Sequence, residues 1–475
     1  MRNSKLLLSF VSATFIIFFS FFDFRLGLAT LLAALLISTL DRNYKPLLIF
    51  LLIGLLLFKN ILTSSLSYHF ENELTKISLT INQGLDFILC VTALIYLSAA
   101  RPKLLIPSKR FLLYILSIFF CYATALLKVD ISSATISLRM LLYPLALYLT
   151  GRITISLGVK KDDIFQTFVS FGVISVIFIA FEVSFPDLVY EITGAHQYIS
   201  LKLGLPFPLS AEQLVQRNTR YLFNSELLKN ISMLRPLGTL LHPISLGYLL
   251  SFCSLLLISK GKVITPIVLM LGIAILGTKG PLLTWFICVL LYWIPHKGKH
   301  ENRIFITSLI LLLTTYVATT FSLGLSSGNP HMVKLLWAIG QLPSVLFGRG
   351  LGSAGVQSSI ASGSDEVGFS DTGLGVLIGQ FGIFSILIYL FYLSLATAGI
   401  TSRDTSERMI SLFVICVLAN SIFQEEGFSP YSLGIGLFYL GSCSLTKWKH
   451  KREEDSFSRQ QRWPLDSTVK NNGKS

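Results

Sequence analysis

Apolar runs separated by short polar connections follow one another along most of the chain. A helix needs about 20 mainly apolar residues to cross a bilayer, because its backbone polar groups must pair within the segment. Three short runs, 26–40, 281–294 and 409–421, are compatible with tilted, re-entrant or half-spans. The pattern predicts an all-α polytopic membrane protein with about 12–14 transmembrane helices. The fourteen candidate runs lie at about 6–22, 26–40, 46–63, 84–100, 111–127, 134–150, 164–185, 238–258, 263–278, 281–294, 304–323, 371–398, 409–421 and 428–445.

Two connections are much longer than the rest, at 186–237 and 324–370. Connections of this length are commonly functional or disordered, and neither of these has the composition of a disordered segment. We therefore expect the chemistry in and around these two loops. The predicted organisation is an N-terminal bundle of about seven spans (1–185), a first large loop (186–237), central spans (238–323), a second large loop (324–370), C-terminal spans (371–445) and a basic tail (446–475).

Composition supports the membrane class. Hydrophobic residues make up 52% of the 475 residues and charged residues only 13%. Soluble proteins carry about 25% charged residues, so a soluble multidomain enzyme, a disulfide scaffold and a disordered chain are all disfavoured. The six cysteines lie in apolar runs without CxxC spacing, which favours small buried side chains over a zinc site or a disulfide framework.

The formal net charge of +14 indicates either a nucleic-acid partner or a topology signal. With the N-terminus in the cytoplasm, 26 of the 39 lysines and arginines fall on the cytoplasmic side and 12 on the outer side, and Arg139 lies inside the sixth span. This positive-inside bias predicts cytoplasmic termini, two outer loops and no nucleic-acid partner. The first run follows Arg2 and Lys5, lacks a small-residue cleavage site and is predicted to be a retained span. Topology does not explain the 12 outer basic residues, which are therefore candidates for ligand binding.

The first loop carries two groups of candidates. Residues 210–234 show a helical pattern, with Arg217 and Arg220 on a polar face that either binds a ligand or only solvates the helix. The segment RPLGTLLHP places Arg235 and His242 where a span begins, and its prolines and glycines interrupt helix regularity. Irregular backbone at membrane depth is tolerated only where it is buried in protein or lines a wet cavity. A functional role for Arg235 and His242 is therefore favoured over a structural one.

Further candidates lie at other outer ends of spans and in the second loop. Lys279, in the turn GTKGP, is the only charge between two apolar runs. In the second loop a short helix ended by Pro343 precedes LFGRGLGSAG, whose glycines and Arg349 would let backbone N–H groups approach an anion. Ionisable residues at membrane depth are usually functional or paired, so structural pairing of Arg139 remains an alternative. Acidic residues at outer ends are Asp86, Glu182, Asp371, Glu425 and Glu426.

The order of these motifs resembles that of the O-antigen polymerase and O-antigen ligase superfamily of bacterial inner-membrane proteins. RPLGTLLHP resembles the family's Arg–x–x–Gly–x–x–x–His/Asn–Pro start of a span, and AILGTKGPLLTWFICVLL resembles its Ser-Arg-Gly span. LFGRGLGSAG is similar to its glycine-rich outer segment, and SDTGLGVLIGQFGIFSILIYL to its Asn-x-x-Leu…Glu-x-Gly-Ile span. The resemblance covers about residues 230–440. Lys279 stands where arginine is usual in the family, and Ser370-Asp371 stands where His-Asn is usual.

The resemblance implies a GT-C-like helical membrane glycosyltransferase at the periplasmic face of the inner membrane. Its donor and acceptor would be glycans linked to undecaprenyl diphosphate, and it would need no metal or nucleotide cofactor. Breaking the sugar–diphosphate bond releases an anion that arginines and lysines can stabilise. The candidates for this role are Arg235, Arg217, Arg220, Lys279, Arg349 and Arg139. A base must take the proton of the acceptor hydroxyl, and the candidates are His242, Glu425, Glu426 and Asp371.

The predicted function is a polysaccharide polymerase, for O-antigen or exopolysaccharide, that transfers a growing glycan from undecaprenyl diphosphate to a lipid-linked repeat unit. One alternative is an O-antigen ligase, which transfers the glycan to lipid A–core. Another is a lipid-linked oligosaccharide flippase, but no internal repeat is visible and the boundary charges share one side. A non-enzymatic membrane scaffold gives no reason for Arg235, His242 and Lys279 to converge. A chain-length regulator protein is an open partner.

Overall fold

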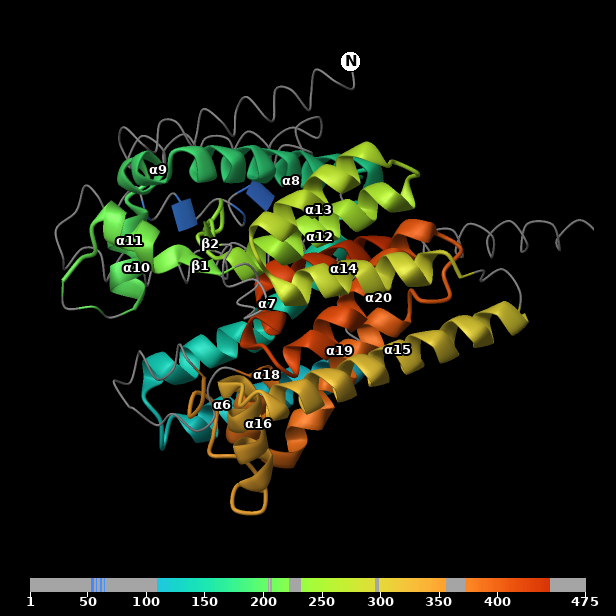
Figure 1. The fold of residues 1–475 in the computed structure, drawn as a ribbon. Coiled ribbons are helices and arrows are strands. Elements are labelled where there is room, and N and C mark those ends of the chain that lie inside the picture. The colour runs from blue at the N-terminus through green and yellow to red at the C-terminus, as the bar shows by residue number, and fades with distance from the viewer. Residues whose placement is uncertain are drawn as a thin grey trace, which may run out of the picture.

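The computed structural model describes residues 109–156, 158–203, 205, 207–221, 232–294, 299–355 and 372–444, together with Ile53, Gly54, Leu57, Asn60, Ile61 and Ser64. The predicted spans at 6–22, 26–40 and 84–100, most of the span at 46–63 and the basic tail at 446–475 lie outside these residues. The described part is predominantly helical, and its helices gather in one bundle (Figure 1). Its only strands form one short antiparallel pair.

Four helical segments of the described part are long and apolar enough to cross a membrane. They are the helix α7 (Ile131–Ser156), the helix α8 (Lys161–Ser184), the helix α15 (Lys299–Ser326) and the segment Gly373–Thr397. The expected all-α membrane architecture is therefore confirmed at the level of helices and their composition. Shorter helices of the bundle are α6 (Lys109–Ala125), α12 (Pro243–Ser259), α13 (Ile264–Ile275), α14 (Lys279–Tyr292) and α20 (Thr405–Ser421).

Successive helices run back and forth, so the bundle has two ends. At one end, which we call the loop end, α8 finishes, α12 begins and α20 finishes (Figure 1). At the opposite end α7 finishes, and α8, α13 and α20 begin. Between α8 and α12, at the loop end, lie α9 (Pro186–Ile192), α10 (Ala195–Lys202), α11 (Ala211–Asn218), β1 (Thr219–Tyr221) and β2 (Ser232–Leu234).

The centre of the bundle is formed by α12 and α20, which are buried on nearly every side. A helix that is apolar all round has to be surrounded by other helices, and α12 packs against α8, α13, α14 and α20. Gly247 permits the close contact with α14, since a Cβ there would lie 2.5 Å from the Thr278 hydroxyl. Large apolar side chains are instead exposed on the outer helices α6, α13, α15 and α19 (Ser385–Thr397), as expected of surfaces that face lipid.

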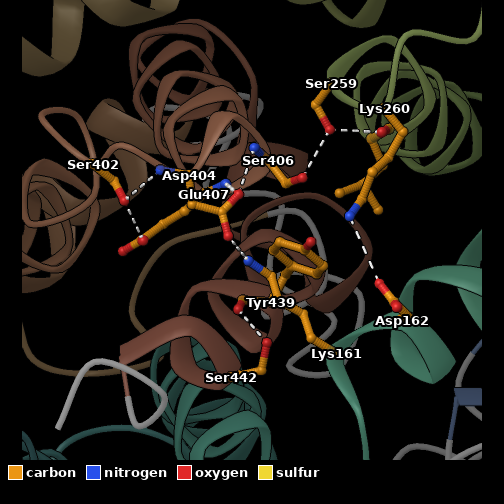
Figure 2. A network of polar contacts seen from close by, with 11 residues as sticks. Lys161, Asp162, Ser259, Lys260, Ser402, Asp404, Ser406, Glu407, Tyr439 and Ser442 are labelled. Atoms are coloured by element: carbon orange, nitrogen blue, oxygen red, sulfur yellow. Dashed lines mark hydrogen bonds and ion pairs between the residues drawn. The ribbon is translucent and has the colours of Figure 1, made fainter. Parts of the chain in front are cut away.

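A polar network joins three helices at the opposite end (Figure 2). Lys161 of α8 forms an ion pair with Asp404 at the start of α20, and its ammonium lies 5.2 Å from the ring centroid of Tyr439. Lys260 Nζ at the end of α12 lies 3.6 Å from an Asp162 carboxylate oxygen. One hydrogen bond, from the Ser259 hydroxyl of α12 to the Ser406 hydroxyl of α20 (3.0 Å), completes the network. The network holds α8, α12 and α20 together at the end of the bundle where positively charged residues are concentrated.

The helix predicted over 210–234 is wrong at 219–221 and 232–234, which form strands. Ser210 caps α11, because its hydroxyl accepts a hydrogen bond from the Gln213 N–H. The helix stops at Asn218, where the chain becomes extended and β1 pairs with β2 in the register Thr219↔Leu234. The backbone groups of 219–221 pair with those of 232–234, so the apolar spacing that suggested a longer helix does not mark one buried face.

The second large loop forms the predicted short helix, α16 (Pro330–Gly340), which Asn329 caps. The glycine-rich segment after it packs closely on other backbone. The N–H groups of Arg349 and Gly350 donate to carbonyls of Gly379 and Gln380 (2.8 and 3.2 Å), so these two amides are not open to an anion. At Gly352, with a φ of 85°, a Cβ would lie 2.5 Å from the Ala134 nitrogen. Close packing therefore explains these glycines.

Two predicted C-terminal spans are interrupted. The run at 371–398 is divided into α18 (Gly373–Phe381), a single 3-10 turn η5 (Gly382–Phe384) and α19. Gly382 makes the break, because its φ is 58° and a Cβ there would lie 2.1 Å from the Leu346 carbonyl oxygen. The run at 428–445 begins with η6 (Glu425–Phe428) and the π-turn η7 (Pro430–Gly434) before it becomes helical over 435–444. The second interruption carries Glu426, which belongs to the site described next.

Candidate functional site

The coil from Arg235 to His242 is held against the end of α8 by one buried carboxylate. Glu182 accepts hydrogen bonds from the backbone N–H groups of Leu237 (2.6 Å) and Gly238 (2.8 Å). Backbone that leaves regular structure at membrane depth must have its polar groups paired by protein, and Glu182 pairs two of them at once. The coil that carries both sequence candidates therefore has a defined position relative to the bundle.

His242 ends this coil and caps α12. The Ser245 backbone N–H donates to His242 Nδ1 (3.3 Å), and Pro243 occupies the first helical position, where no N–H is needed. Leu241, immediately before His242, has a φ of 47° and is the one non-glycine residue at positive φ within the described part. The left-handed conformation costs a non-glycine residue about 1–2 kcal/mol, and such strain is found mainly at functional sites.

Arg235 connects two of the sequence motifs. Its Nε–H donates to the Leu276 carbonyl (3.1 Å), which directly precedes the turn GTKGP. The guanidinium is half-buried, and burial together with the charge of nearby Arg220 lowers the pKa of Arg235, whereas Glu426 opposes the change. The segments RPLG and GTKG therefore lie side by side at the loop end.

Five ionisable residues gather at this point, and we call Lys202, Arg220, Arg235, His242 and Glu426 the mouth cluster. His242 Nε2 lies 3.7 Å from Glu426 Oε1. Lys202, the last residue of α10, is half-buried, and burial lowers its pKa while Glu426 opposes the change. Burial, followed by the charges of Lys202 and Arg235, lowers the pKa of His242 to about 3. The imidazole is therefore neutral at pH 7.

The mouth cluster contains three basic side chains, one histidine and one carboxylate. No described residue forms a hydrogen bond or close ion pair with the Lys202 ammonium or with the terminal nitrogens of Arg235. Partly buried charge of one sign is unfavourable unless a counter-charge is present. An anion would supply it, and a guanidinium fork matches the oxygens of a phosphate. The arrangement is suited to a phosphate-bearing ligand beside a proton-accepting carboxylate.

The remaining basic candidates are placed around the cluster. Arg217 lies in the last turn of α11 with an exposed side chain, and nothing brings it into the cluster. Lys279 is the first residue of α14, exposed, three residues from the carbonyl that Arg235 contacts. Arg349 is also exposed, on the glycine-rich segment that packs against α18. Of the predicted diphosphate ligands, Arg235 and Arg220 therefore belong to the cluster.

The two adjacent glutamates of η6 face different neighbours. Glu426 faces His242, as the contact above shows. A Cβ built on Gly355 would lie 3.1 Å from Glu425 Oε1, so Glu425 faces the glycine-rich segment of the second loop. The geometry favours Glu426 over Glu425 as the carboxylate of the site. Asp371 lies outside the described residues.

Helix α10 links Arg139 to the mouth cluster. Arg139 of α7 lies near Tyr198, where its charge opposes the effect of burial, which raises the pKa of Tyr198 to about 12. Tyr198 and Lys202 are four residues apart in α10 and so lie on the same face of the helix. One face of α10 thus runs from Arg139 toward His242 and Glu426.

Sequence reasoning did not single out Lys202, and it did not find the role of Glu182. Lys202 is one of the 12 outer basic residues, and its departure from the positive-inside bias was the available signal. Glu182 was noted as an outer acidic residue, but its role depends on the fold of a coil 55 positions away.

Within the described residues no group of three or more His, Cys, Asp or Glu side chains is placed to hold a metal ion. Comparisons of the chain with protein-family models, with curated proteins and with solved structures find no match.

Proposed function

We propose that this chain is a GT-C-like membrane glycosyltransferase of the bacterial inner membrane, and specifically a polysaccharide polymerase. It transfers a growing glycan from undecaprenyl diphosphate to a lipid-linked repeat unit. The observation that carries the proposal is the mouth cluster, in which three cations and one carboxylate meet at one end of a helical membrane bundle. The motif order RPLGTLLHP, GTKGP and LFGRGLGSAG supports the same assignment.

The cluster suits the chemistry of this transfer. The donor bond breaks between the anomeric carbon and a diphosphate oxygen, and negative charge develops on the leaving diphosphate. Cations that are held in place before the reaction stabilise such charge without having to reorganise. Arg235, fixed at its Nε by the Leu276 carbonyl, can direct its terminal N–H groups to phosphate oxygens, and Lys202 adds a second positive charge.

We further propose that the loop end faces the periplasm and that both termini lie in the cytoplasm. Positively charged residues at the opposite end support this orientation. They include Lys160, Lys161, Lys260, Lys262 and Arg403. The donor's polyprenyl chain would then remain in the bilayer while its diphosphate reaches the cluster at the membrane boundary.

The first test uses the purified chain in liposomes with lipid-linked repeat units extracted from host cells that lack the chain. A polymerase converts these units into a ladder of longer glycans. Arg235→Ala is expected to reduce ladder formation at least about 100-fold, because one preorganised donor to developing charge contributes about that much. Lys262→Ala, an exposed change at the opposite end, is the control and should leave the ladder intact. An unchanged ladder with Arg235→Ala rules out the diphosphate assignment.

A deletion strain separates the three classes that the sequence left open. One repeat unit on lipid A–core, seen on a lipopolysaccharide gel, identifies a polymerase. Core without any unit identifies a ligase. Core without any unit, combined with precursor trapped on the cytoplasmic side, identifies a flippase. In a host whose polymer is a capsule or an exopolysaccharide, the same comparison is made on that polymer.

A further inference from the structure

A transfer of this kind requires a group that accepts the proton of the attacking hydroxyl. The sequence left four candidates for this group, His242, Glu425, Glu426 and Asp371. The structure describes the first three, and their surroundings differ. The inference below rests on the proposed function and concerns which of them accepts the proton.

The Nδ1 nitrogen of His242 is already engaged in hydrogen bonds. The Ser245 backbone N–H donates to Nδ1 at 3.3 Å, and the Ser245 hydroxyl lies 3.0 Å from the same nitrogen. An Nδ1 that accepts a hydrogen bond carries no proton, so the proton of the neutral ring is assigned to Nε2. The lowered pKa of His242 agrees with a neutral ring. No ring lone pair is therefore left to accept a proton from a substrate.

The protonated Nε2 of His242 faces Glu426, with 3.7 Å between Nε2 and Oε1. The backbone around Glu426 is fixed as well, since its carbonyl accepts hydrogen bonds from the Ser432 hydroxyl (2.6 Å) and the Ser429 N–H (3.0 Å). The Glu426 side chain is 34% exposed, so part of it can be reached by a substrate. Glu425 faces Gly355 instead. Only Glu426, among the described candidates, combines a carboxylate, a position beside the cations and exposure.

We propose that Glu426 is the catalytic base and that His242 is a positioning residue. The Glu426 carboxylate takes the proton from the acceptor hydroxyl, and the hydroxyl oxygen forms a bond to the donor's anomeric carbon. The bond from that carbon to the diphosphate oxygen breaks, and its electron pair leaves with the lipid diphosphate, whose charge Arg235 and Lys202 stabilise. Glu426 then loses its proton to water. His242 holds the start of α12 and directs its Nε2–H toward the carboxylate.

The test compares carboxylate variants of the full chain in liposomes with the extracted lipid-linked repeat units. Glu426→Gln is expected to reduce kcat about 100-fold or more, which is the usual contribution of general-base catalysis. Glu426→Asp keeps a carboxylate and is expected to be at least about tenfold more active than Glu426→Gln. Glu191→Gln is the matched control on exposed α9 and should resemble the wild type. Binding of undecaprenyl diphosphate, measured with the isolated lipid, should be retained by Glu426→Gln, which shows that the variant is folded.

The role of His242 is tested by rescue. Asparagine can accept the Ser245 N–H as a helix cap, whereas alanine cannot. If His242 only positions, His242→Asn recovers most of the activity that His242→Ala loses. Equal loss in both variants, with Glu426→Gln still active, assigns the base to His242 and overturns the proposal. A strong loss in Glu425→Gln with little loss in Glu426→Gln overturns it in favour of Glu425. A wild-type chain that makes no ladder refutes the proposed function itself, which is a different outcome from an active Glu426→Gln.

Discussion

Glu182 illustrates how much one side chain can decide at the residue scale. It accepts hydrogen bonds from the N–H groups of Leu237 and Gly238, and the residue is only 1% exposed. We predict that Glu182→Ala lowers the free energy of unfolding by about 2 kcal/mol or more, because two buried donors lose their acceptor. Glu182→Gln also destabilises, since its single amide oxygen cannot accept both bonds in this geometry. Thermal unfolding in detergent measures the effect, and Glu191→Ala, an exposed change, should alter it by about 0.5 kcal/mol or less. Equal melting temperatures for the Glu182 and Glu191 variants would refute the stabilising role of the two hydrogen bonds that Glu182 accepts.

At the scale of elements, the start of α20 combines a helix cap with an ion pair. Asp404 accepts a hydrogen bond from the Ser406 N–H (2.9 Å) and pairs with Lys161. Burial works to raise the pKa of Asp404, but the hydrogen bond and charge of Lys161 outweigh it and lower the pKa. A lowered pKa in the folded state stabilises the fold above the unfolded value of about 4, and this contribution is lost as the pH falls.

Asp404→Asn keeps the cap but removes the charge. Because both partners are partly exposed, we predict a loss of about 1 kcal/mol or less at pH 7. The difference in melting temperature between this variant and the wild type should shrink as the pH falls below about 4, because protonation then removes the same charge from the wild type. Asp130→Asn is the matched control, since Asp130 caps α7 through Ser132 (2.9 Å) and Ser133 (3.2 Å). A pH-dependent difference of the same size in the control would assign the effect to capping alone.

At the scale of the whole molecule, the distribution of charge between the two ends predicts the orientation in the membrane. A single cysteine introduced at Glu212, exposed on α11, should react with a membrane-impermeant maleimide in intact spheroplasts. One introduced at Lys262 should react only after the membrane is permeabilised. The parent chain is the background control for its six native cysteines. The reverse labelling pattern contradicts the proposed periplasmic site.

Part of this picture follows from the sequence alone. The apolar runs located α7, α8, α12, α14, α15 and α20 because lipid and protein interior select the same residues over about one span. The motif RPLGTLLHP marked a break before a helix, since prolines and glycines change local backbone preference wherever they stand. The sequence therefore determined the membrane class, most helix positions of the described part and the candidates Arg235 and His242.

Tertiary structure alone decided which of the charges meet. Lys202, Arg235 and Glu426 lie far apart in the sequence, and hydrophobic periodicity records local burial but carries no information on which distant side chains face one another. The same reason explains the error at 210–234, where pairing between β1 and β2 rather than local spacing selected strands at 219–221 and 232–234. It also explains why His242 resembled a base in the sequence. Only the folded coil shows that Nδ1 of His242 caps α12 by accepting the Ser245 N–H and that Nε2 faces Glu426.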